Sequence, residues 1–147
     1  MKVWLHDLRW PEVEAYLENN DTILLPLGST EQHGRHLPLK TDTVEATEVA
    51  QAVAERTGVL AAPPLPYGWP PHHMAFPGTL TLRPETLAVV IEDICQSLIF
   101  QGFRKIFILN GHRIFNRPRR RSSPRGFGAA PGRSSVPWTW RWSPFWK

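Results

Sequence analysis

The sequence predicts an α/β fold, a layered αβα domain in which helices cover a mostly parallel sheet. The first reason is the order of the elements, because short apolar runs typical of buried strands alternate along the chain with stretches of helical periodicity. The second reason is size: 147 residues, 41% of them hydrophobic, are enough for one domain with a real core and too few for two comfortable ones. We therefore expect a single α/β domain.

The first half of the predicted domain contains a short helix, a strand and a long helix. Pro11 stands in the first turn of the short helix, and turn-forming Asn and Asp residues follow at 19–21. The apolar run TILLPLGS, residues 22–29, is typical of a buried strand. The segment 41–58 has apolar residues at helical spacing, acidic residues near its start and Gly58 just past its end, which predicts an amphipathic helix.

The second half predicts two more strands and another long helix. Residues 59–82 begin as a short strand, continue as a long proline-rich loop and end in a strand candidate at 78–82. The segment 83–103 predicts a helix that stops at Gly102, and the run KIFILN, residues 105–110, predicts another buried strand. Because ligands bind beyond the carboxyl ends of parallel strands, the polar loops that follow the two long strands should open onto one rim.

The net charge of +4 conceals two different parts of the chain. Residues 1–112 carry 8 Lys+Arg and 13 Asp+Glu, a net −5, whereas residues 113–147 carry 9 Lys+Arg and no acid, a net +9. The second part is rich in Arg, Pro and Trp and lacks helical or strand periodicity, which is typical of disorder. We therefore predict an α/β domain at 1–112 and a basic, disordered tail at 113–147.

The expected location is the cytoplasm. The N-terminal segment lacks the apolar stretch of a secretory signal peptide, and no segment reaches the roughly 18 uninterrupted apolar residues that a membrane span needs. The single cysteine, Cys95, excludes an internal disulfide and lies among apolar residues in a helical pattern, which indicates a buried structural thiol. We expect a soluble cytoplasmic protein.

Four side chains that can bind a metal ion flank the two predicted strand ends. Glu31 and His33 follow the first strand, and Asp42 stands at the entrance of the next helix. His112 follows the second strand. Residues two apart in an extended segment point the same way, so Glu31 and His33 can face one ion or straddle two neighbouring ions. A catalytic divalent ion needs such imidazole and carboxylate ligands. Each residue also has an ordinary alternative: Asp42 as the N-terminal cap of its helix, and the histidines as solvated or hydrogen-bonded loop residues.

Four motifs together resemble the creatininase (creatinine amidohydrolase) family. They are GSTEQHGRHLPLKTD at 28–42, HHMAFPGTLTL at 72–82, Pro-Glu-Thr at 84–86 and ILNGH at 108–112, in the family's order over roughly residues 5–112. The resemblance implies a binuclear metal-dependent amidohydrolase that acts on a small-molecule amide substrate and breaks its C–N bond. It also implies two divalent metal ions, Zn or Mn, and assembly into homo-oligomers, commonly hexamers in full-length relatives.

The same resemblance implies the roles of individual residues. Glu31 and His33 match ligands of different metal ions, Asp42 matches the carboxylate that bridges them, and His112 matches a further ligand. His73 matches a histidine close to the substrate pocket and is the predicted catalytic residue, with a plain loop histidine as the alternative. In the implied chemistry, a water molecule between the two ions attacks the carbonyl carbon while one ion polarises the carbonyl oxygen.

The sequence departs from the family pattern after His112. Relatives continue this motif with Gly-Gly-Asn or Tyr-Glu-Asn, whereas this chain reads NGHRIFN. The glutamate that completes the shell of the second ion has no counterpart, because no acidic residue follows Asp93. The resemblance thus implies a fold that is incomplete at the C-terminus, truncated or frameshifted beyond residue 112, and it leaves the activity of this chain open.

The tail at 113–147 has two further interpretations besides a frameshifted end. Its arginines could contact phosphates and its tryptophans could stack on bases, so the alternative function is a non-catalytic remnant that binds nucleic acid through the tail. A cluster of Trp and Arg can also lie at a membrane interface. The residue types of the tail are those of GC-rich DNA read out of frame, so we expect neither nucleic acid nor a membrane as the partner.

Overall fold

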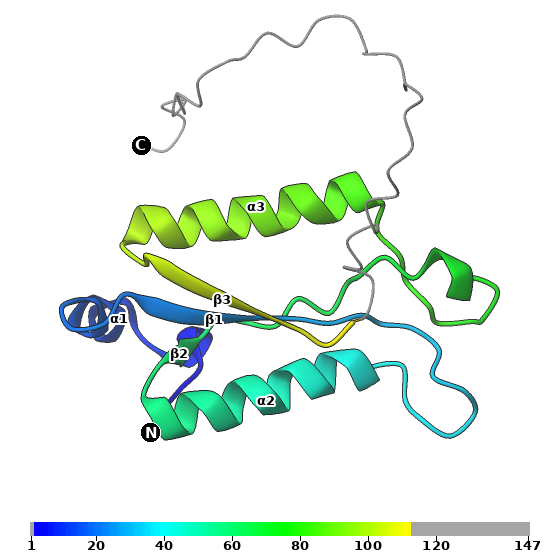
Figure 1. Cartoon of the computed structure of the whole chain (residues 1–147), viewed down its shortest axis with the longest axis horizontal. Helices are drawn as coiled ribbons and strands as arrows, with labels where there is room; N and C mark the ends of the chain where they lie inside the picture. The colour runs from blue at the N-terminus through cyan, green and yellow to red at the C-terminus, as the bar shows by residue number, and fades with distance from the viewer. Residues whose placement is uncertain (1, 113–147) are drawn as a thin grey trace, which may run out of the picture. The chain divides into compact units, whose positions relative to one another are not determined.

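The computed structural model describes residues 2–112, so the tail predicted at 113–147 lies outside the described residues. The chain divides into two units, Met1–Asn116 and Arg117–Lys147, and the fold is that of the described part of the first. The elements, shown in Figure 1, are η1 (Leu5–Asp7), α1 (Trp10–Leu17), β1 (Thr22–Leu27), α2 (Thr41–Thr57), β2 (Leu60–Ala61), η2 (Pro71–His73), α3 (Pro84–Gln101) and β3 (Lys105–Asn110). No helix within residues 2–112 is long and apolar enough to span a membrane.

Three parallel strands form the sheet, in the order β2-β1-β3. The central strand β1 pairs with β3 along its whole length, from Thr22 opposite Lys105 to Leu27 opposite Asn110, and pairs with β2 near its start. Figure 1 shows α2 on one face of the sheet and α3 on the other. The predicted layered αβα architecture with a parallel sheet is confirmed.

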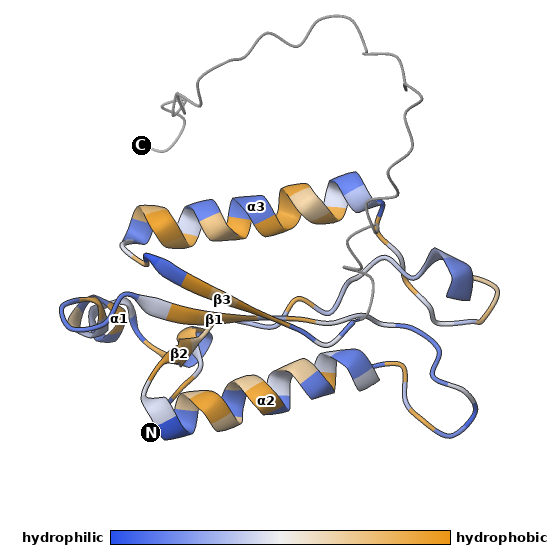
Figure 2. Cartoon of the chain, in the orientation of Figure 1, coloured by the Kyte–Doolittle hydropathy of each residue, from blue (hydrophilic) through white to orange (hydrophobic). Residues whose placement is uncertain are grey.

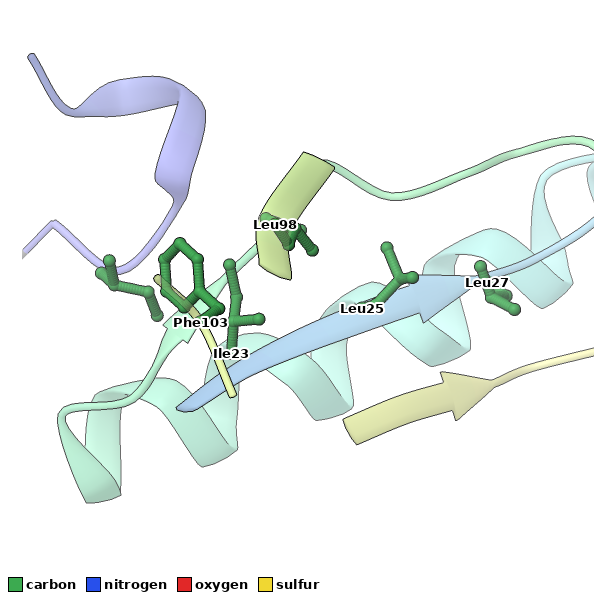
Figure 3. Packing of buried hydrophobic residues seen from close by; sticks show 7 residues of the cluster. Ile23, Leu25, Leu27, Leu98 and Phe103 are labelled. Carbon is green, nitrogen blue, oxygen red and sulfur yellow. The ribbon is translucent and has the colours of Figure 1, made fainter. Parts of the chain in front are cut away.

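One face of β1 packs against α3 and Phe103, which lies just beyond that helix. Ile23, Leu25 and Leu27 alternate along the strand, so they point to the same face, where they form a buried cluster with Leu98 and Phe103 (Figure 3). Phe103 is completely buried. Truncating a buried phenylalanine to alanine costs about 3–5 kcal/mol, so this cluster contributes a large share of the stability of the domain.

The opposite face of the sheet packs against a stripe of alanines on α2. Ala46, Ala50 and Ala54 are four residues apart, so they lie on one side of the helix, and all three are buried. Leu24 of β1 packs against the last two. Because an alanine side chain is a single methyl group, the helix lies close to the sheet. It ends, as predicted, at Gly58, which adopts the left-handed conformation with φ 73°.

The strand β3 is not the second buried strand that the sequence predicted. It is apolar along most of its length, as Figure 2 shows, yet Phe107 and Ile108 are 58% and 49% exposed. Within residues 2–112 it pairs only with β1, and its side chains are exposed or half-buried on both faces. The prediction was wrong because an apolar run does not reveal how many neighbouring elements surround a strand.

Two smaller predictions also need correction. Residues 78–82 form no strand; Leu80 and Thr81 make only isolated bridges to earlier loops, because no continuous strand lies beside them. Cys95 is half-buried rather than buried, since it lies at the border of the α3 surface that packs against the core. Partial burial raises the pKa of its thiol.

Candidate metal centre

The candidate site lies where β1 and β3 end. Because the two strands are parallel and Leu27 lies opposite Asn110, the residues that follow them emerge at the same edge of the sheet. One further hydrogen bond, from the backbone N–H of Gly111 to the carbonyl oxygen of Leu27 (2.9 Å), continues the pairing up to His112. The two polar loops therefore open onto one rim, as the sequence predicted.

Two glycines let the first turn of α2 approach both strand ends. A methyl group added to Gly28 would overlap the backbone of Thr43, and one added to Gly111 would overlap the backbone carbonyl of Asp42. Neither position can hold a side chain unless the helix moves. These close contacts place Asp42 against the ends of β1 and β3.

Asp42 is buried in the first turn of α2 and contacts two histidines. Its Oδ1 lies 2.8 Å from Nε2 of His33, and its Oδ2 lies 2.6 Å from Nδ1 of His112. The alternative role of Asp42 as a helix cap does not apply, because Lys40 is the N-cap residue and no side chain caps the helix. One carboxylate therefore joins a residue that follows β1 to a residue that follows β3.

Glu31 brings a second buried carboxylate to the same place. Its Oε2 accepts a hydrogen bond from Oγ of Ser29 (3.0 Å) and lies 3.3 Å from Nδ1 of His112. One ligand atom each of Glu31, Asp42 and His112 lie within 4.8 Å of one another. A single metal ion can span that spacing.

The chemistry of these three residues fits a divalent cation. Burying a carboxylate is costly unless a positive charge compensates it. Among the described residues, the ion pairs of Glu31 and Asp42 are with histidines alone, which are charged only when protonated. Within the same range, Nε2 of His112 is buried and has no hydrogen-bond partner. Nitrogen and oxygen donors without a thiolate are suited to zinc and manganese.

His33 approaches Asp42 from the other side. Its Nδ1 lies 3.2 Å from the backbone carbonyl oxygen of Glu31, so Nδ1–H donates to that oxygen and Nε2 faces Asp42. Burial opposes the charged form of His33, but the hydrogen bond to the Glu31 carbonyl and the charge of Asp42 outweigh burial, and the pKa of His33 is raised. His33 thus contacts Oδ1 of Asp42, whereas Glu31 lies beside His112, which contacts Oδ2.

His73 reaches the rim from η2, in the proline-rich loop. Its Nε2 lies 3.9 Å from Oε1 of Glu31, and its Nδ1 lies 2.8 Å from Nε2 of Gln32. The loop is tied to the end of β1, since the backbone N–H of Leu65 donates to the carbonyl of Pro26 (3.0 Å). The structure thus brings all five residues predicted for the site to one edge of the sheet.

Two residues that contact the site were not predicted. Ser29 donates to the Glu31 carboxylate, and the Gln32 amide contacts His73. Their only signal in the sequence is their place inside the motif at 28–42, because a hydrogen bond between side chains leaves no periodicity.

The comparison with known families decides the relationship. The family model described as creatinine amidohydrolase matches residues 6–121. This chain belongs to the creatininase family. The match includes almost the whole range of about 5–112 over which the sequence motifs carry the resemblance.

Relatives with described activities differ in what they act on. A creatinine amidohydrolase from Pseudomonas putida is 38% identical over 116 residues, covering 75% of this chain and 45% of the relative. A 3-dehydro-scyllo-inosose hydrolase from Thermotoga maritima is 35% identical over 111 residues, covering 75% and 36%. A mycofactocin precursor peptide peptidase from Mycobacterium ulcerans is 45% identical over 100 residues, covering 62% and 40%. This chain thus spans less than half the length of each of these relatives.

Solved structures of creatininases share the fold. The crystal structure of a creatinine amidohydrolase has a TM-score of 0.72 at 38% identity, covering 75% of this chain and 45% of that one. A creatininase described as the Mn form has a TM-score of 0.73 at 36% identity, covering 76% and 46%. A variant creatininase described as the Zn-Zn type has a TM-score of 0.72, with the same identity and coverage.

Proposed function

We propose that this chain contains the metal-binding part of a creatininase-type amidohydrolase, which hydrolyses an amide C–N bond with two divalent ions, zinc or manganese. The observation that carries the proposal is the position of Asp42, whose two carboxylate oxygens contact His33 and His112. In this proposal Glu31, Asp42 and His112 hold the first ion, and His33 and Asp42 contribute to the second. Structures of relatives described as Mn and Zn-Zn forms support the choice of metals.

The ions and the side chains have different tasks in the reaction. Divalent ions polarise a carbonyl oxygen and lower the pKa of water towards neutrality. Asp42 sets the spacing of the two positions, and Ser29 holds the carboxylate of Glu31. His73, beside Glu31, is the catalytic histidine of this proposal and forms a hydrogen bond with the bound amide. In the net reaction the C–N bond breaks, and water supplies a hydroxyl to the carbonyl carbon and a proton to the departing nitrogen.

The substrate in this proposal is a small-molecule amide. The names of two relatives refer to creatinine and to a precursor peptide. Both of these compounds contain a C–N bond next to a carbonyl group. We also propose that the protein is cytoplasmic and assembles into homo-oligomers. The chain would then consist of a family domain at 1–112 and a separate tail at 113–147.

The metal content of the purified chain tests the metal centre. The full chain should be loaded with zinc, freed of unbound metal by gel filtration and compared by elemental analysis with Asp42→Ala and with the control Asp93→Ala, an exposed acid of α3. We expect about one zinc ion or more per chain in the wild type and the control, and none in Asp42→Ala. Equal zinc in Asp42→Ala and the wild type would contradict the proposed ligands.

Hydrolysis assays on the zinc-loaded chain test the activity. Creatinine and short peptides are suitable first substrates, with release of the ring-opened or cleaved product as the measurement. We expect turnover that requires zinc, is lost in Asp42→Ala and is strongly reduced in His73→Asn. A chain that binds zinc at the predicted residues but hydrolyses no amide would overturn the activity and leave the metal centre standing.

A further inference from the structure

Gln32 lies between two proposed metal ligands, yet its side chain contacts neither of them. Its Oε1 lies 3.0 Å from the backbone nitrogen of Gly34, and its Nε2 lies 2.8 Å from Nδ1 of His73. The same amide nitrogen is 3.5 Å from Nε2 of His73, so Nδ1 is the nearer ring nitrogen. The function proposed above gives Gln32 no task.

The backbone of Gly34 determines which way the Gln32 amide points. A backbone N–H can only donate, so the atom that it contacts must be the amide oxygen, and the NH₂ group is left to face His73. An NH₂ group can only donate as well, so Nδ1 of His73 must accept. A neutral imidazole carries a single N–H. The proton of neutral His73 is therefore on Nε2.

His33 shows the opposite arrangement in the same loop. Its Nδ1–H donates to the backbone carbonyl of Glu31, which leaves Nε2 as the ring nitrogen that faces Asp42. A histidine that binds a metal ion through one ring nitrogen usually donates the other N–H to a carbonyl or carboxylate oxygen. By this criterion the surroundings of His33 are those of a metal ligand, and the surroundings of His73 are not.

The loop that carries His73 is held in place by the same short segment. The backbone N–H of Gln32 donates to Oγ1 of Thr79 (3.2 Å), and the backbone N–H of Leu80 donates to the carbonyl of Thr30 (2.9 Å). Thr79 is buried. The Gln32 side chain thus contacts His73 itself, while the backbone of Thr30 and Gln32 holds the end of the loop at Thr79 and Leu80.

We propose that Gln32 is a positioning residue that keeps the proton of His73 on Nε2, the nitrogen that lies 3.9 Å from Oε1 of Glu31. With its proton there, Nε2 cannot take up the ion beside Glu31, and it acts as a hydrogen-bond donor towards an acceptor atom of the bound amide. The choice of tautomer follows from the geometry of the chain alone, whereas the role towards the substrate rests on the proposed function.

Nuclear magnetic resonance of the imidazole nitrogens measures the tautomer directly. The full chain, labelled with nitrogen-15 at histidine, should be examined without metal and with zinc at about pH 9, where an ordinary histidine is neutral. His73→Asn identifies the signals of His73. The first test variant is Gln32→Glu, whose carboxylate has the same shape as the amide but can only accept hydrogen bonds. The second is Gln32→Met, whose side chain has no amide to donate or accept a hydrogen bond. Gln96→Glu, at an exposed position of α3, is the matched control.

We expect the proton of His73 on Nε2 in the wild type and in the control. It should move to Nδ1 in Gln32→Glu, because a carboxylate needs a donor, and it should be distributed over both nitrogens in Gln32→Met. A wild-type proton on Nδ1, or one tautomer shared by the wild type and Gln32→Glu, would overturn the inference. If either Gln32→Glu or Gln32→Met shows no thermal unfolding transition, that variant is unfolded, and the comparison uses the other one.

Kinetics of the zinc-loaded chain separate this inference from the proposed function. Gln32→Met should lower kcat about ten- to hundredfold and change KM by less than about threefold, since the residue acts through His73. Absence of amide hydrolysis in the wild type would refute the proposed function and leave the tautomer result standing. Zinc-dependent hydrolysis with equal kcat in the wild type and Gln32→Met would refute the role of Gln32 alone.

Discussion

The two sides of Asp42 are built differently, although one carboxylate serves both. On the His112 side, Glu31 adds a third donor, and all three residues are buried. On the other side, the part of the chain that the structure describes supplies only His33, which is half-buried. In the proposed metal centre the shared carboxylate therefore does not make two equal sites, because each additional donor must come from a segment that the fold brings to the rim.

Removing His112 should have the largest effect on this asymmetry. His112→Ala takes away one of the three donors of the stronger position, so we expect the affinity for the first zinc ion to fall by more than about a hundredfold. Isothermal titration with zinc measures the change, and His6→Ala, an exposed histidine, is the control. An affinity equal to that of the wild type would mean that the stronger position is elsewhere.

Gly111→Ala should weaken the same position indirectly. Its added methyl group overlaps the backbone carbonyl of Asp42, so α2 must move away from the end of β3. We expect a loss of about 1–3 kcal/mol in the free energy of unfolding and about tenfold weaker zinc binding. Urea denaturation and zinc titration are the measurements. Gly58→Ala, at the far end of α2, serves as the control for helix stability: it should lower stability but leave the affinity for the first zinc ion unchanged.

His33→Ala should leave the stronger position nearly intact. Of the two carboxylate oxygens of Asp42, His33 contacts Oδ1 and His112 contacts Oδ2. The affinity for the first zinc ion should therefore change by less than about threefold, while any weaker second binding disappears. Zinc titrations of the two proteins measure both events. If His33→Ala lowered the affinity for the first zinc ion as much as His112→Ala does, the two sides of Asp42 would have to be regarded as one site.

The smallest expected effect is the pH dependence of the metal-free protein. The pKa of His33 in the folded chain is raised above its ordinary value of 6.5. The ion pair with Asp42 therefore stabilises the fold fully below about pH 6.5, and this contribution is lost as the pH rises through the raised pKa. The stability difference between wild type and His33→Ala should shrink by up to about 1 kcal/mol between about pH 5.5 and pH 8. Urea denaturation in chelator-treated buffer tests this, and a difference that grows with pH would contradict it.

The main elements of the fold could be predicted from the sequence because their signals are local. The run TILLPL gives β1, and the helix at Thr41–Thr57 follows from its apolar spacing and from Gly58. The exposure of β3 could not be predicted in the same way. Phe107 and Ile108 are as apolar as the residues of β1, and only the number of neighbouring elements distinguishes the two strands.

The residues of the candidate site could be named from their motifs, but their connections could not. Whether Glu31 and His33 face one position or two depends on where α2 places Asp42, and that depends on contacts at Gly28 and Gly111. The contact between Gln32 and His73 joins residues 41 apart in the chain. No spacing rule predicts a hydrogen bond of that kind.

The position of Asp42 between two imidazoles also has a consequence for how metal is taken up. Below the raised pKa of His33, its proton supplies the positive charge that a divalent ion would bring beside Asp42, so an ion that arrives there must displace this proton into the buffer. Acid and metal therefore compete for the same carboxylate, and the heat measured on loading depends on the buffer that receives the proton.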